Sequence, residues 1–224
     1  MQKEINKVYL PIGDREMLEF CLETMDRSPQ IDRIVLVVRE EDQPHAEILI
    51  AETMPSKLTD VVPGGPSRHE SEYAGLSALS DAIGNGDIEI VAIHDGARPF
   101  MTLELLDEVI EAARRTGGAI PGLRVEEPLF RVESETASLL EPETLRRVQT
   151  PQAFRAAPLL EAYRRAGAAG YHGVDTAETI ERYSDLSITV VPGDPHNIKV
   201  TFVEDFFEAE GYAQAWEKGR WRKP

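Results

Sequence analysis

The 224-residue sequence has few cysteines, no long apolar run and a shortage of basic residues. Its single cysteine, Cys21, cannot form a disulfide within the chain, which favours a reducing compartment. No apolar stretch approaches the roughly 20 residues that a membrane-spanning helix needs. Lys3, Glu4 and Lys7 stand where a secretory signal would have its apolar core. We therefore expect a cytoplasmic protein that does not enter a membrane.

The charge balance narrows the choice of partners. Lysine and arginine number 24 against 40 acidic residues, which gives a formal net charge of -16. Such a surface repels nucleic acids and anionic membranes, so neither is an expected partner. A local cluster of lysine and arginine in a cleft can still bind a small anion. The length suits one domain with a substantial core.

Apolar residues alternate between the spacing of helices and that of strands. The run Ile34–Val38 is continuous and mostly β-branched, which is typical of a buried parallel strand. Thr102 is a predicted N-cap. We predict an α/β fold, a doubly wound Rossmann-like and mostly parallel sheet with helices on both faces. Further strands are predicted at 59–62, 88–93, 119–125, 187–191 and 198–200, and helices at 17–25, 46–53, 67–83, 102–115, 157–165, 175–183 and 203–216.

One segment interrupts this rhythm. Residues 126–147 are acidic, contain Pro128 and Pro142, and have only short alternating stretches. This pattern favours an excursion from the sheet, such as a hairpin. We therefore predict a single domain over 1–224 with an inserted β-arm at about 126–147.

In doubly wound folds, ligands bind beyond the carboxyl ends of the strands, and this rule selects three loops. The first loop runs from Val62 to Ser71. Gly64 and Gly65 would let the backbone approach a ligand, and the following helix N-terminus would favour negative charge. The alternative is an ordinary strand-to-helix turn with Arg68 on the surface.

The second loop runs from Ile93 to Phe100. Asp95, at the end of a strand, can hold Mg²⁺ or a sugar hydroxyl. Arg98 can form a bidentate clamp on a phosphate. The alternative has Asp95 accepting from turn amides and pairing with Arg98. His94 is expected to be a packed histidine and not a base.

The third loop, 194–201, contains Lys199 between Ile198 and Val200. A lysine within an apolar strand is costly unless it is paired. It would be either a rigid phosphate ligand facing the cleft or an edge-strand lysine that points into solvent. Strand alternation leaves both readings open.

Together these motifs resemble those of the 2-C-methyl-D-erythritol 4-phosphate cytidylyltransferases. The resemblance covers essentially the whole chain, in the family's order and spacing, and extends to enzymes that act on ribitol 5-phosphate. The His-Asp-Gly-Ala-Arg form of the second motif favours the 2-C-methyl-D-erythritol 4-phosphate enzymes over those that act on ribitol 5-phosphate. The motifs are Gly64-Gly65-x-x-Arg68-x-x-Ser71, His94-Asp-Gly-Ala-Arg-Pro99, Gln149-Thr-Pro-Gln152 and Asn197-Ile-Lys-Val-Thr201.

The resemblance implies transfer of CMP from CTP to a polyol phosphate, with pyrophosphate as the leaving group. The attacking phosphate is already ionised, so catalysis needs positioning and charge neutralisation, with Mg²⁺ as cofactor. It also implies a homodimer in which the arm completes the neighbour's site. The residues it assigns are Lys7 and Lys199 to catalysis; Gly64, Gly65, Arg68, Ser71, Asp95 and Gly96 to CTP; Asp95, Arg98, Thr150 and Asp175 to the acceptor; and Asp95 to the metal.

The sequence departs from the family at its beginning. No strand and no Gly-x-Gly-x-Arg-Met loop precede Lys7. Our hypothesis is that Met1 is the methionine of that loop, with roughly 15–25 residues upstream. The chain as given is then expected to lack a central strand of its sheet and to have low activity.

Other departures lie mainly on the acceptor side. The arm reads Glu127-Pro128-Leu129-Phe130 where Asp-Thr-Ile-Lys is usual, and Pro142 falls near the place of an arginine. The family's Thr-Asp-Asp-Ala is Val174-Asp175-Thr176-Ala177 here. Two alternatives therefore stay open: another acceptor such as ribitol 5-phosphate, or a non-catalytic nucleotide-binding relative.

Overall fold

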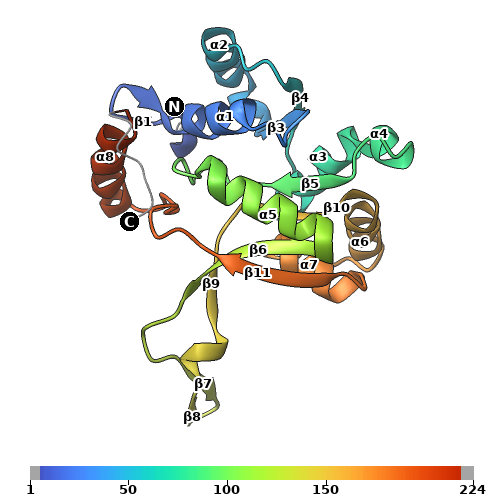
Figure 1. Cartoon of the computed structure of the whole chain (residues 1–224), viewed down its shortest axis with the longest axis vertical. Helices are drawn as coiled ribbons and strands as arrows, with labels where there is room; N and C mark the ends of the chain where they lie inside the picture. The colour runs from blue at the N-terminus through green and yellow to red at the C-terminus, as the bar shows by residue number, and fades with distance from the viewer. Residues whose placement is uncertain (1–5, 218–224) are drawn as a thin grey trace.

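A five-stranded sheet forms the centre of the fold in the computed structural model, which describes residues 6–217 (Figure 1). The strand order is β11-β6-β10-β5, and β9 also pairs with β6. β11 is parallel to β6, whereas β10 is antiparallel to both β5 and β6, and β9 is antiparallel to β6. The strands are β5 (Ile90–Ile93), β6 (Gly117–Arg124), β9 (Arg146–Val148), β10 (Gln152–Arg155) and β11 (Ser187–Pro192).

Helices cover both faces of this sheet because successive strand residues point to opposite sides. Ala119 and Ala153 pack against α5, whereas their neighbours Ile120 and Phe154 pack against α6 and α7. The prediction of an α/β fold with helices on both faces is therefore confirmed. The helices are α5 (Leu103–Thr116), α6 (Ala156–Ala168) and α7 (Thr176–Tyr183).

The prediction of a single, mostly parallel sheet is wrong in two respects. First, β10 was not predicted, and it runs against its neighbours. Second, β3 (Ile34–Val38) and β4 (Leu58–Pro63) form a separate parallel pair, covered by α1 (Met17–Arg27) and α2 (Gln43–Thr53). A cavity of about 640 Å³ lies between β3 and β5, and the described residues place no strand in it.

Local signals account for the N-termini of two helices. Thr102 caps α5 by accepting from the Leu105 amide at 3.2 Å, as predicted. Ser67 caps α3 in the same way. The predicted helix 67–83 is two helices, α3 (Arg68–Ala78) and α4 (Ser80–Gly84). The prediction of a strand at 198–200 is wrong. This segment is irregular, and one backbone hydrogen bond, from the Val200 amide to the Ala97 carbonyl at 2.8 Å, connects it to the second loop.

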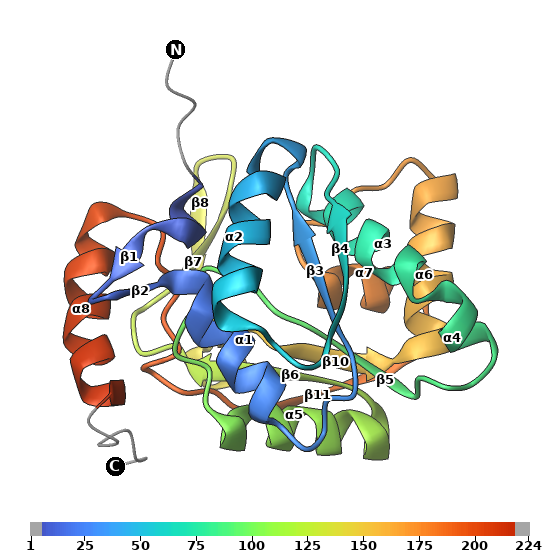
Figure 2. The same cartoon turned by 90° about the horizontal axis from the view of Figure 1, so that it is seen from above.

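The last helix packs against the first elements of the chain. α8 (Val203–Glu217) buries Ala209 and Ala213 in a cluster with Ile12, Phe20 and Phe100, and Figure 2 shows it beside β1. This packing brings the beginning of the chain close to the third loop. The early elements are η1 (Lys7–Tyr9), β1 (Pro11–Ile12) and β2 (Arg15–Glu16), and a second 3-10 turn is η2 (Glu40–Asp42).

The segment predicted as an arm contains a hairpin that projects from the body (Figure 1). It consists of β7 (Phe130–Glu133), β8 (Thr136–Leu139) and η3 (Pro142–Thr144). Its strands expose Phe130, Val132 and Leu139. Met1, on which the start-site hypothesis depends, lies outside the described residues. Within residues 6–217 no helix has the length and apolar character to cross a membrane.

Close packing at Gly118 provides a test of the sheet. An added Cβ would lie 2.6 Å from Cδ1 of Phe154, so Gly118→Ala should lower the free energy of unfolding by about 1–3 kcal/mol. Gly167, in α6, has open space around it, and Gly167→Ala should raise that free energy by about 0.5–1 kcal/mol. Urea unfolding of both variants measures the two effects, and equal stabilities would contradict the described packing.

Candidate active site

The carboxylate of Asp95 joins the three predicted loops. Its Oδ1 lies 2.8 Å from Nη1 of Arg68, in the first loop, and its Oδ2 lies 2.8 Å from Nζ of Lys199, in the third. Burial by itself raises the pKa of Asp95, but Arg68 and Lys199 outweigh it and hold the pKa below its usual value. Asp95 therefore stays ionised between two cations, and the alternative pairing with Arg98 is not the one formed.

Lys199 contacts this carboxylate, and Lys7 lies close enough to feel the charges of both. Lys199 pairs with Asp95 while its side chain stays 42% exposed, so the structure combines features of the two readings left open for it. Burial, followed by repulsion from Lys199, lowers the pKa of Lys7, while Asp205 and Asp95 oppose the shift. The structure thus brings together both lysines that the resemblance assigns to catalysis. Their mutual repulsion makes the site favourable for an anion.

The glycine loop is held by Ser71. Its Oγ accepts from the Gly65 amide at 3.2 Å and donates to the Ser67 carbonyl at 2.9 Å. A Cβ on Gly65 would lie 2.3 Å from Cβ of Glu70, so only glycine fits this turn. The loop therefore presents backbone at the N-terminus of α3, where an anionic or polar ligand is favoured.

His94 is a packed histidine, as expected. Burial lowers its pKa to about 4, so the ring is neutral at physiological pH. Its Nε2 lies 3.0 Å from the Arg98 carbonyl, and its Nδ1 lies 3.1 Å from Oγ1 of Thr150. Thr150 in turn accepts from the Asp95 amide at 3.1 Å. The hydroxyl of Thr150 thus fixes the backbone that carries Asp95.

Arg98 is oriented by the third loop. Its Nη1 donates to the Asn197 carbonyl at 2.7 Å, and Asn197 donates from Nδ2 to the Thr150 carbonyl at 2.8 Å. The Nε of Arg98 is buried without a hydrogen-bond partner. One donor of this guanidinium is therefore left over for a ligand, although the acceptor role of Arg98 remains a prediction.

Both carboxylate oxygens of Asp175 accept hydrogen bonds from within the protein. It caps α7 by accepting from the Ala177 amide at 3.0 Å, and its Oδ2 accepts from Nε2 of Gln152 at 2.8 Å. Its assignment to the acceptor stays a prediction. Gly96, in the second loop, has its carbonyl 3.7 Å from the Cys21 thiol.

Sequence reasoning missed Glu72. This carboxylate accepts from Nε of Arg68 at 2.7 Å, from Oγ1 of Thr176 at 3.0 Å and from the hydroxyl of Tyr163. The spacing of Arg68 and Glu72, four residues apart on a predicted helix, is the signal that could have found the pair.

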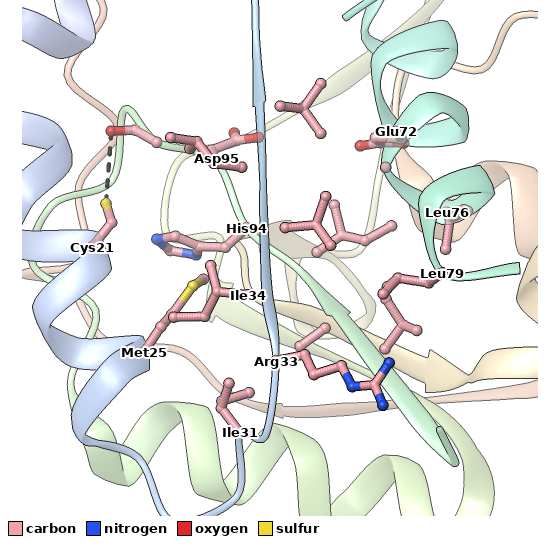
Figure 3. Close-up of a pocket in the computed structure, with 18 of the residues that line it drawn as sticks. Cys21, Met25, Ile31, Arg33, Ile34, Glu72, Leu76, Leu79, His94 and Asp95 are labelled. Atoms are coloured by element: carbon pink, nitrogen blue, oxygen red, sulfur yellow. Dashed lines mark hydrogen bonds between the residues drawn. The ribbon is translucent and has the colours of Figure 1, made fainter. Parts of the chain in front are cut away.

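The cavity between β3 and β5 ends at this site (Figure 3). Ile34, Met25 and Leu76 are among its apolar lining residues, and Figure 3 places Asp95 and Glu72 towards the same end, on different elements. Charged side chains also line the cavity away from this end, Arg33 among them, and Asp95 and Glu72 are the ones that belong to the site.

Comparisons with known proteins agree with the geometry. The family model described as IspD, 2-C-methyl-D-erythritol 4-phosphate cytidylyltransferase, matches residues 1–215. The protein of that name from Geobacillus kaustophilus is 36% identical over 94% of this chain and 90% of its own length. The one from Bacillus mycoides is 33% identical over 95% and 92%.

Solved structures show the same likeness. The 4-diphosphocytidyl-2C-methyl-D-erythritol synthase from Anaerococcus prevotii superposes with a TM-score of 0.84 at 29% identity, covering 93% of this chain and 90% of its own. The cytidylyltransferase from Thermus thermophilus gives 0.76 at 29% identity, covering 93% and 94%. With its motifs, fold and site in agreement, the chain belongs to the IspD family of 2-C-methyl-D-erythritol 4-phosphate cytidylyltransferases.

Proposed function

We propose that this enzyme transfers CMP from CTP to 2-C-methyl-D-erythritol 4-phosphate, a step of non-mevalonate isoprenoid precursor biosynthesis. The observation that carries the proposal is the pairing of Asp95 with both Arg68 and Lys199, in a chain of this family. An oxygen of the acceptor phosphate forms a bond to the α-phosphorus of CTP, and the bond to pyrophosphate breaks. Both reactants are anions, so the site must supply positive charge.

Lys7 and Lys199 supply that charge. Burial and, after it, repulsion from Lys199 lower the pKa of Lys7, and an α-phosphate beside both lysines would relieve that repulsion. The two ammonium groups are gathered at the site before substrate arrives, so the protein has already met the cost of bringing them together. To reach the phosphate, the ammonium group of Lys199 would have to weaken its ion pair with Asp95.

The donor set fits a magnesium ion that is shared with substrate. Within residues 6–217 no group of three or more His, Cys, Asp or Glu residues can hold a metal. Mg²⁺ commonly binds through one or two carboxylates together with substrate phosphates, and Asp95 offers one ionised carboxylate. Asp95 would hold the ion, which when bound neutralises charge on the triphosphate.

The remaining residues would orient the two substrates. Gly64, Gly65 and Ser71 would hold the cytidine through the glycine loop, with Arg68 and Gly96 beside it. On the acceptor side, the unused Nε of Arg98 is the donor available to a phosphate. Thr150 and Asp175 are already bonded within the protein, so they would act by holding Asp95 and α7 in place.

The arm supports a homodimer. Phe130, Val132 and Leu139 are each more than half exposed on a hairpin of two strands. Such a hairpin is marginally stable alone, and burial against a second copy would remove this apolar surface from water. A cytoplasmic location is consistent with the one free, buried cysteine.

Lys199→Ala should lower kcat about 10²- to 10³-fold, because a preorganised positive charge at the transferred phosphate is lost. The measurement is CTP-dependent pyrophosphate release with 2-C-methyl-D-erythritol 4-phosphate. Lys57→Ala is the matched control, since Nζ of Lys57 binds the Ser28 carbonyl outside the site. Unchanged turnover in the Lys199 variant would contradict its catalytic role.

The preferred acceptor is found by comparing turnover of two polyol phosphates. With CTP and Mg²⁺ present, kcat/KM for 2-C-methyl-D-erythritol 4-phosphate should exceed that for ribitol 5-phosphate by at least about tenfold, as expected of a site that discriminates by polar contacts. A higher kcat/KM for ribitol 5-phosphate would favour the alternative in which that polyol phosphate is the acceptor. Absence of turnover with both would favour a non-catalytic nucleotide-binding protein.

The dimer is tested at the arm. Phe130→Glu places a charge in the proposed interface and should shift sedimentation from dimer to monomer. Phe207→Glu, on the exposed side of α8, is the control and should leave the oligomeric state unchanged. A wild-type monomer, or equal behaviour of the two variants, would contradict assembly through the arm.

A further inference from the structure

Arg68 is bound on two sides by carboxylates from different elements. Its Nε donates to Oε1 of Glu72 at 2.7 Å, and its Nη1 lies 2.8 Å from Oδ1 of Asp95. Its Nη2 is buried and has no hydrogen-bond partner. Because a guanidinium is planar and its donors form a rigid fork, these two contacts fix the orientation of the whole group.

Glu72 is itself held in place. Besides Arg68, it accepts from Thr176, the first residue of α7, and from the hydroxyl of Tyr163, in α6. The Tyr163 ring is stacked on His69 with centroids 4.6 Å apart, and the Glu72 side chain is only 9% exposed. The carboxylate therefore also accepts hydrogen bonds from two helices outside the glycine loop.

We propose that Glu72 is a positioning residue of the transfer reaction. It holds Arg68 in the orientation that reaches Asp95, and so divides the negative charge of Asp95 between Arg68 and Lys199. The inference rests on the proposed function, because its consequence is for catalysis. If Arg68 turned away, Asp95 would draw on Lys199 alone, and Lys199 would be less free to meet the nucleotide.

The contact with Thr176 extends this role across the site. Thr176 follows Asp175, which lies on the side assigned to the acceptor, whereas Arg68 belongs to the glycine loop assigned to CTP. Glu72 thus joins the two halves through one carboxylate. A purely structural reading would have Glu72 serve only to tether α3 to α6 and α7.

A double-mutant cycle separates these two readings. Wild type, Glu72→Gln, Arg68→Ala and the double variant are compared by kcat and KM, well below the lowest Tm of the four. Glu72→Gln should lower kcat/KM for CTP about tenfold, through loss of a charge-assisted bond, while the KM for the acceptor stays unchanged. In the Arg68→Ala background, Glu72→Gln should have no further effect, because Glu72 acts through Arg68. Equal losses in both backgrounds would overturn the proposal.

Tyr163→Phe controls for simple loss of stability. It removes the hydroxyl that Glu72 accepts from but leaves the Glu72–Arg68 contact, so it should lower Tm without changing kcat/KM for CTP. A loss of kcat/KM in this variant as large as that in Glu72→Gln would favour the tether and overturn the positioning role.

A measurement without turnover keeps the two proposals distinguishable. Hydrogen exchange at the Arg68 Nε–H, followed by NMR, should be slow in the wild type and about tenfold faster in Glu72→Gln. Glu161→Gln, in the more exposed Arg165–Glu161 pair, is the control and should leave Arg68 unchanged. An inactive wild type would refute the transfer function alone, whereas Arg68 exchange that is insensitive to Glu72→Gln would refute the positioning role.

Discussion

A carboxylate removed from water needs compensating charge, and Asp95 obtains it from loops that are far apart in the sequence. Arg68 precedes it by two helices and a strand, α3, α4 and β5, and Lys199 lies about a hundred residues after it. The two ion pairs, together with the hydrogen bond that the Asp95 backbone amide donates to the Thr150 hydroxyl, define where the loops meet. The other polar contacts follow from this point: Arg98 bonds to the third loop, Glu72 to Arg68, and Thr150 to a neutral His94. The site is thus a network organised by one ionised group.

Much of this arrangement could be predicted because strand ends gather at one edge of a sheet. That rule selected the glycine loop, Asp95 and Lys199, and the structure brings them together. It could not tell which arginine pairs with Asp95. Arg98 is nearer in sequence, but its guanidinium bonds to Asn197, whereas Arg68 arrives through the fold. Glu72 was missed because its partners Tyr163 and Thr176 come from two later helices that only tertiary packing places beside it.

The fold was less predictable at its strands than at its helices. A strand is defined by the hydrogen bonds of its partner, which an apolar pattern does not reveal. Gln152–Arg155 is short and polar at both ends, yet it lies between β5 and β6 as their shared antiparallel neighbour. Residues 198–200 alternate between apolar and polar side chains, but they make one backbone hydrogen bond to the second loop. Helix caps depend on neighbouring residues alone, and the Thr102 cap was accordingly predicted correctly.

The thiol of Cys21 has a practical consequence. It is buried against the second loop, with its Sγ 3.4 Å from the Arg98 carbonyl, and burial raises its pKa to about 12. A thiol in this state reacts slowly with alkylating reagents and oxidants, because the thiolate is the reactive form. Since the sequence contains no other cysteine, one introduced on the arm would be the sole readily reactive thiol of the chain. The native protein is therefore already suited to attachment of a fluorophore or spin label at a chosen site.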